Sequence, residues 1–84
     1  MLNLERLNKM KCTVKLVWDD EAQVWITDSN DVPGLFLESE SFDELIEKIR
    51  VAAPELLLLN CKYERPVYLI FEAVRVASGF DLVS

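Results

Sequence analysis

The sequence predicts a small α+β domain in which a three-stranded antiparallel sheet, one helix and a returning C-terminal strand follow one another along the chain (β-β-β-α-β). Apolar residues alternate from Lys11 to Trp18, which is typical of a strand with one buried face. Ser41 then opens a segment whose apolar residues recur at helical spacing. A second β-branched and aromatic run follows Pro66 and predicts the returning strand.

The length of 84 residues allows one domain and no second core. We assign that domain to residues 11–79. Residues 1–10 form an N-terminal segment that we expect to be frayed, because its leucines are too sparse to organise a core element. Residues 80–84 form a C-terminal tail. A domain of this size buries only about 60–65% of its unfolded surface, so self-association as a dimer would stabilise it.

The first strand is expected over residues 11–18, and polar residues 19–23 then break the alternation. This short break predicts an antiparallel hairpin to a second strand over residues 24–27. Residues 28–31 are expected to form a loop, because Asp, Ser and Asn bond their own backbone in turns. The residues expected on the buried face of the first strand are Cys12, Val14, Leu16 and Trp18.

Pro33 and Gly34 form a turn signal, and residues 35–39 follow as a third strand. Ser41 is expected to cap the helix, with its hydroxyl accepting a hydrogen bond from the Glu44 amide. The Glu44 carboxylate would complete a capping box by accepting from the Ser41 amide.

The helix is expected to be kinked or broken at Pro54, which lacks the amide that would donate to the Arg50 carbonyl. Asn60 is the expected C-cap. The apolar stripe that should face the sheet consists of Phe42, Leu45, Ile46, Ile49 and Ala53.

Four successive leucines surround the last turns of this helix, so at least one of them should lack a place in the core. The residues that we therefore expect to mediate self-association are Leu56, Leu57, Leu58 and Leu59. After a connection over residues 61–65, a long apolar run over residues 67–77 predicts the last strand, bent or bulged, which ends by Gly79.

The charge is distributed unevenly along the chain. Residues 19–47 carry ten acidic residues and no basic residue, within a net charge of −6. A direct nucleic-acid binder needs the opposite sign, so we expect none. Two interpretations stay open: a solvated acidic face, or a docking surface for a basic protein. The acidic residues expected to contact such a partner are Glu38, Glu40, Asp43 and Glu47.

The composition argues against an enzyme. The chain has no histidine, so the commonest general base and metal ligand is missing. Its two glycines are isolated and form no phosphate-binding loop. The aspartates near the hairpin lack the spacing of a calcium loop. We expect no catalytic residues, no cofactor and no metal site.

Four further residues invite a functional interpretation. Cys12 and Cys61 lack the CxxC spacing of a metal or redox pair and are expected to be two buried small hydrophobic residues rather than a disulfide or a metal pair. Trp18 and Trp25 flank the hairpin, where core or cross-strand packing is favoured over stacking on a ligand. No apolar run approaches the ~18 residues of a membrane span, and no signal peptide is evident, so we expect no membrane association and a cytoplasmic protein.

Several segments resemble a family of short bacterial domains of unknown function grouped with the HicB antitoxins. The likeness covers roughly residues 13–71, and its densest parts are the Trp-Asp-x-Glu-Ala-x-Val-Trp run at residues 18–25 and Asp-Val-Pro-Gly-Leu at residues 31–35. The resemblance implies a three-stranded antiparallel sheet, a helix across it and a returning strand.

For function, the resemblance implies a protein-binding antitoxin module that covers a small basic RNA-cleaving toxin. HicB antitoxins usually also carry a C-terminal DNA-binding module. No part of this sequence is typical of a helix-turn-helix or ribbon-helix-helix, so DNA binding is not carried over. The alternative is a stand-alone homo-oligomeric domain with a structural or small-ligand-binding role.

Overall fold

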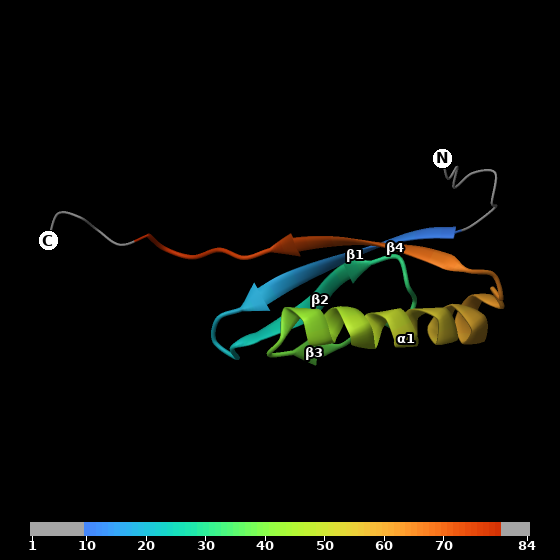
Figure 1. Cartoon of the computed structure of the whole chain (residues 1–84), viewed down its shortest axis with the longest axis horizontal. Coiled ribbons are helices and arrows are strands. Elements are labelled where there is room, and N and C mark those ends of the chain that lie inside the picture. Colours follow the sequence, from blue (N-terminus) through green and yellow to red (C-terminus); the bar gives the residue numbers. More distant parts are fainter. Residues whose placement is uncertain (1–9, 80–84) are drawn as a thin grey trace, which may run out of the picture.

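The computed structural model describes residues 10–79, which form a four-stranded sheet with one helix packed across one of its faces (Figure 1). The elements are β1 (Met10–Asp19), β2 (Val24–Asn30), β3 (Glu38–Ser39), α1 (Phe42–Cys61) and β4 (Val67–Val74). The strand order is β3-β2-β1-β4, with β2 antiparallel to both β1 and β3. The predicted α+β class and order of elements are confirmed. The returning strand joins the sheet parallel to β1, so the sheet is mixed and has four strands rather than three.

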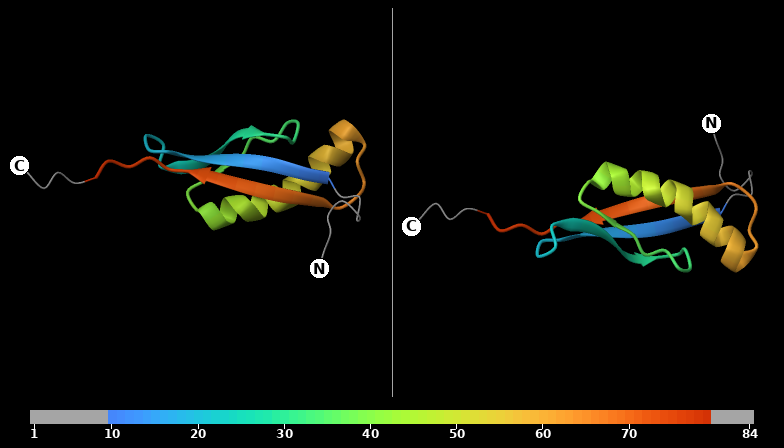
Figure 2. Two further views of the ribbon diagram at one scale, coloured as in Figure 1. Left: turned by 90° about the horizontal axis from the view of Figure 1, so that it is seen from above. Right: turned by 90° about the horizontal axis from the view of Figure 1, so that it is seen from below.

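The core lies between α1 and the face of the sheet that α1 covers (Figure 2). Alternation along β1 buries three side chains there, and helical spacing along α1 buries four more. Each fully buried aliphatic side chain contributes about 1.5–3 kcal/mol through removal of apolar surface from water. The buried apolar residues of the core are Cys12, Val14, Leu16, Val32, Leu35, Leu45, Ile49, Ala53 and Leu57.

The first two strands are longer than predicted. Met10 already pairs with Val67, so β1 begins one residue before the predicted strand, whereas residues 1–9 and 80–84 lie outside the described part of the chain. The predicted loop over residues 28–31 is also wrong for its first three residues, because β2 continues to Asn30. A register shift between Val14 and Leu16 lets Asn30 pair with Val14.

The third strand is shorter than the predicted residues 35–39. Only Glu38 and Ser39 pair regularly with β2. Before them, the Leu37 amide donates to the Thr27 hydroxyl at 3.0 Å, while the Thr27 amide donates to the Leu37 carbonyl at 3.1 Å. The Thr27 hydroxyl thus replaces the backbone carbonyl that would accept this hydrogen bond in a regular β-ladder. Regular strand pairing therefore begins only after Leu37.

Helix α1 begins at the predicted cap, since the Glu44 amide donates to the Ser41 hydroxyl at 3.2 Å. The second half of the predicted capping box is wrong. The Ser41 amide donates to the Ser39 hydroxyl instead, and the Glu44 carboxylate forms an ion pair with Lys48 at 3.2 Å. A lysine one turn along the helix therefore competes successfully for this carboxylate.

The helix continues through Pro54, so a break there is wrong. Buried Ala53 and Leu57 hold both sides of the proline against the core, and burial outweighs one missing hydrogen bond. The helix also ends later than predicted. The C-cap is Lys62 in the left-handed conformation, not Asn60, whose side-chain amide instead donates to the Pro33 carbonyl at 3.1 Å.

Strand β4 pairs with β1 over its whole length without a bulge, so the predicted irregularity is absent. It ends at Val74, opposite Val17, because β1 turns into the hairpin shortly afterwards and offers no further partner. Residues 75–79 continue away from the body of the domain (Figure 1). The radius of gyration of 16.0 Å reflects this extension, since a compact chain of this length has about 12 Å.

Candidate functional site

Three of the ten acidic residues in the block 19–47 have structural roles in turns. The Asp19 carboxylate accepts from the amides of Glu21 and Ala22 and so closes the hairpin. The Asp20 carboxylate accepts a hydrogen bond from the indole of Trp18. The Asp31 carboxylate accepts one from the backbone amide of Thr13, which lies just before the register shift between β1 and β2. These three carboxylates are committed to the fold and are poor candidates for partner contacts.

Two further acids are neutralised on the surface of α1. Glu44 pairs with Lys48, and Glu47 pairs with Arg50 at 2.9 Å. Both pairs are exposed, so each contributes at most about 1 kcal/mol. Glu47 is one of the residues predicted to contact a partner, and its carboxylate is already paired with a basic residue of the same helix. Lys48 and Arg50 can form these pairs because they follow the acidic block directly in the sequence.

The remaining predicted contact residues, Glu38, Glu40 and Asp43, lie together around β3 and the first turn of α1. All three are exposed. Among the residues that the structure describes, their carboxylates accept no hydrogen bond and join no ion pair. Asp43 also lies in the first turn of α1, where a negative charge interacts favourably with the helix dipole. These three residues are named here the acidic cluster.

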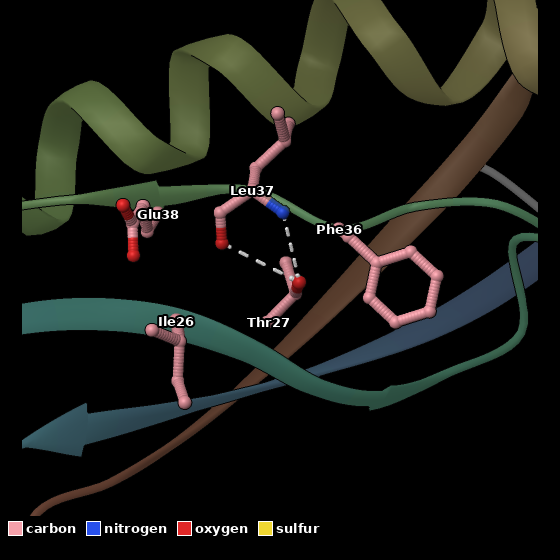
Figure 3. Close-up of a pocket in the computed structure, with 5 residues that line it drawn as sticks. All are labelled: Ile26, Thr27, Phe36, Leu37 and Glu38. Atoms are coloured by element: carbon pink, nitrogen blue, oxygen red, sulfur yellow. Dashed lines mark hydrogen bonds between the residues drawn. The ribbon is translucent and has the colours of Figure 1, made fainter.

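Phe36 lies beside the acidic cluster and is 81% exposed, although it is one of the largest apolar side chains in the domain. It borders a shallow pocket of about 480 Å³ that also has Ile26 and Glu38 in its wall. Figure 3 shows Leu37 directed toward α1 and Phe36 directed away from it. Phe36 and Glu38 therefore share the face of the sheet that the helix leaves open.

Phe36 is not among the residues that the sequence predicts for the site, because residues 35–39 indicate only a strand. Alternation contains the missing signal. Leu35 is buried and Leu37 is half-buried, so the residues between and after them, Phe36 and Glu38, must face the other way. Phe36 lies two residues before Glu38, so both side chains point to the same face of the sheet, which is the open one.

The segment that carries Phe36 is held by side-chain hydrogen bonds from β2. Asn30 accepts from the Val32 amide at 2.8 Å and donates to the Leu35 carbonyl at 3.3 Å. Gly34 has a φ of +82°, which a residue without Cβ adopts at no steric cost. These constraints fix the backbone on both sides of Phe36, so the ring is presented on an ordered segment.

The two tryptophans pack across the hairpin, as predicted. Trp18 and Trp25 are opposite each other in the β1–β2 register, with ring centroids 5.6 Å apart in an edge-on arrangement. Trp25 also meets Phe42 of α1 at 4.9 Å. The Arg75 guanidinium stacks over Trp18 at 4.2 Å from the ring centroid. This cluster joins the hairpin, the helix and the chain that follows β4.

Both thiols are free and Cys12 is buried, as predicted, but Cys61 is exposed, so the expectation that both are buried is wrong for Cys61. Burial raises the pKa of the Cys12 thiol, and the Asp31 carboxylate raises it further. Over residues 10–79, no group of three or more His, Cys, Asp or Glu side chains is placed to hold a metal ion. No helix in that range is long and apolar enough to cross a membrane.

The four leucines at the end of α1 occupy four different environments. Leu57 is buried in the core and Leu56 is half-buried. Leu58 is 47% exposed and Leu59 is 77% exposed. The expectation that not all four find a place in the core is confirmed, and it concerns Leu58 and Leu59.

The site and fold define a two-layer α+β domain with a helix on one face of a mixed sheet and an open face that carries an exposed aromatic residue beside acidic residues. Within that class, the chain belongs to a family described as a domain of unknown function, DUF1902, whose match spans residues 11–80.

A crystal structure of a hypothetical protein from the extremely thermophilic bacterium Thermus thermophilus has the same fold, with a TM-score of 0.69. The two sequences are 43% identical, and the match covers 82% of this chain and 99% of that one. No curated protein matches the chain.

Proposed function

We propose that this domain is a non-catalytic protein-binding module of the cytoplasm whose partner is a basic protein. The observation that carries the proposal is the juxtaposition of Phe36 with the acidic cluster of Glu38, Glu40 and Asp43. An exposed aromatic side chain next to a pocket is the usual centre of a binding surface, and charged residues usually form its rim.

The two components have different tasks in this proposal. Phe36 supplies apolar area, which contributes to affinity when a partner covers it. The acidic cluster attracts a basic partner and orients it, which chiefly raises the association rate. The intramolecular partners of Glu44 and Glu47 leave these two carboxylates less available than the cluster.

The resemblance to HicB antitoxins suggests the class of partner. Those antitoxins cover a small basic toxin that cleaves RNA, and a surface that combines acidic residues with an aromatic anchor suits such a partner. We therefore infer that this domain acts as the antitoxin of a toxin–antitoxin pair. The protein encoded by an adjacent reading frame, if it is small and basic, is the first candidate.

The test is co-expression with that neighbouring protein, followed by binding measurements at low and high salt. Glu38→Lys with Asp43→Lys should slow association at least about tenfold at low salt and flatten its salt dependence, because screening acts on exposed charges. Phe36→Ala should instead speed dissociation. Glu55→Lys is a matched control, since Glu55 is an exposed acid outside the block. If neither the Glu38→Lys/Asp43→Lys variant nor Phe36→Ala changes the binding rates, this surface is not the binding site.

A second candidate function is a stand-alone homo-oligomeric domain with a structural or small-ligand-binding role. The exposure of Leu58 and Leu59 favours it, because exposed leucines next to each other at the end of a helix are typical of a subunit contact. A stable oligomer with no basic neighbour in the genome and no complex on co-expression would favour this alternative over the antitoxin.

A further inference from the structure

Strand β4 is an edge strand that lacks the features by which proteins usually protect such an edge. It pairs with β1 on one side, and among residues 10–79 no strand lies on its other side. Its eight residues, Val67–Val74, contain no proline, no lysine and one charged residue, Glu72. Its register with β1 has no bulge. A long, regular and apolar edge is a template for another strand.

The helix adds an apolar flank beside this edge. Arg50, Pro54 and Leu58 recur every four residues along α1 and so form one row. Arg50 and Pro54 line a groove of about 340 Å³ together with residues of β4, among them Leu69 and Phe71. Leu58 continues the row into an adjoining pocket that Pro54 also lines. On this side the core is therefore covered only in part.

The distribution of charge indicates which partner fits this flank. The chain has a net charge of −6 and repels a copy of itself unless the acidic residues stay outside the contact. The acidic cluster lies at β3, at the opposite end of the strand order from β4. On the β4 flank, Arg50 pairs with Glu47, and Glu72 stands opposite Lys15 in the register. The adjoining pocket adds Glu55, Glu64 and Arg65. Acidic and basic residues therefore nearly balance on this flank, which suits a second copy and does not suit a basic protein.

We propose that two copies of this chain bind through β4, with the two strands antiparallel around a two-fold axis near the middle of the strand. The sheets then join into one sheet of eight strands, and each copy covers the groove of the other. Because a two-fold interface uses the same patch twice, an apolar edge with little net charge is self-complementary. This proposal stands on the β4 flank alone and is independent of the acidic cluster.

The dimer also accounts for the path of residues 75–79, which leave the body of the domain after β4 (Figure 1). In an antiparallel pair, the end of one β4 lies beside the start of the other. Residues 75–79 of one copy therefore run along the partner's connection between α1 and β4. Val76, which is 85% exposed in the single chain, gains cover there.

The first test is sedimentation equilibrium of the full chain at micromolar concentration, where we expect a dimer. Ile70→Glu places like charges near the axis and should weaken the dimer at least about tenfold. Leu58→Glu should weaken it through the helix flank. Val51→Glu is the matched control, because it also replaces an exposed apolar residue of α1 outside the row. A monomeric wild type, or equal weakening by the control, would overturn the proposal.

The second test needs no substitution and therefore does not depend on whether a variant folds. Amide hydrogen exchange along β4 should slow on going from dilute to concentrated protein, at alternate residues whose amides point to the outer edge. Amides of β2 should not change. The acidic cluster and the β4 flank are separate, so unchanged partner binding in Glu38→Lys with Asp43→Lys, alongside an intact dimer, would count against the proposed function alone. Exchange along β4 that is independent of concentration would refute the dimer.

Discussion

The indole ring of Trp25 stands between two aromatic neighbours, 5.6 Å from Trp18 across the hairpin and 4.9 Å from Phe42 on the helix. Both contacts are edge-on, with interplanar angles of 64° and 77°. Such geometry places the positive edge of one ring against the negative face of another. One side chain therefore ties the hairpin to the start of α1.

Replacing Trp25 by alanine should lower the free energy of unfolding by about 3 kcal/mol, because a large half-buried ring and two aromatic contacts are lost together. Denaturant unfolding measures this. A double-mutant cycle that combines Trp25→Ala with Phe42→Ala should show a coupling free energy of about 1 kcal/mol between the two rings. Additive effects of the two substitutions would contradict the contact.

Thr27→Val should lower the free energy of unfolding by about 1–3 kcal/mol, because it leaves the Leu37 amide without its acceptor. Valine has nearly the same shape, so the loss reports the hydrogen bond at 3.0 Å. Thr13→Val is the control. Thr13 is half-buried, and its hydroxyl makes no hydrogen bond within residues 10–79. Equal losses in the two variants would show that the Thr27 hydroxyl does not hold the Phe36 segment.

Gly34→Ala should destabilise the domain by about 1 kcal/mol because of its φ of +82°. Crowding adds little, since a Cβ at this position meets only Leu56 and Asn60, at 3.5 Å. Gly79→Ala is the matched control, because, apart from its chain neighbours, no atom of the described residues lies within 4 Å of its added Cβ. Thermal unfolding of both variants checks the prediction, which a neutral Gly34→Ala would refute.

A water-soluble maleimide should label Cys61 quickly and Cys12 only after unfolding. Cys61 is exposed, whereas Cys12 is 1% exposed on the core face of β1. Burial removes access and raises the pKa of the Cys12 thiol, so less of the reactive thiolate forms. Mass spectrometry after timed labelling gives the two rates. Rapid native labelling of Cys12 would contradict the register of β1.

The raised pKa of Cys12 also predicts a pH dependence of stability. The unfolded thiol ionises near its ordinary pKa of 9.0, while the folded thiol ionises only at higher pH. The contribution of Cys12 to stability is therefore complete below pH 9.0 and falls as the pH rises through the folded-state pKa. Cys12→Ala should lose less stability than the wild type over this range, and Cys61→Ala should behave like the wild type.

Much of the fold is readable from local patterns, because alternation, helical spacing and capping depend on neighbours in sequence. Three features could be predicted in this way: the buried face of β1 with Cys12 and Leu16, the Ser41 cap, and the apolar stripe of α1 that includes Ile49. The errors arise where contacts distant in sequence decide. Asn60 binds Pro33 instead of capping the helix, and Thr27 replaces part of the β3 ladder.

The candidate site was predictable in part. Glu38, Glu40 and Asp43 follow from the charge count, because exposed acids without a basic residue nearby in sequence tend to stay unpaired. Glu47 differs because Arg50 lies three residues further along the same helix face. Phe36 was missed since its environment depends on which face of the sheet α1 covers.

The parallel pairing of β1 with β4 has a consequence for how the protein is made. Met10, at the start of β1, pairs with Val67, at the start of the last strand. β1 is therefore translated long before its second neighbour and carries an open apolar edge while the ribosome completes the helix. Contacts between residues so distant in sequence form slowly. Folding of this domain must wait until Val74 has left the ribosome, and in that interval the unfinished sheet is the form most exposed to aggregation and proteolysis.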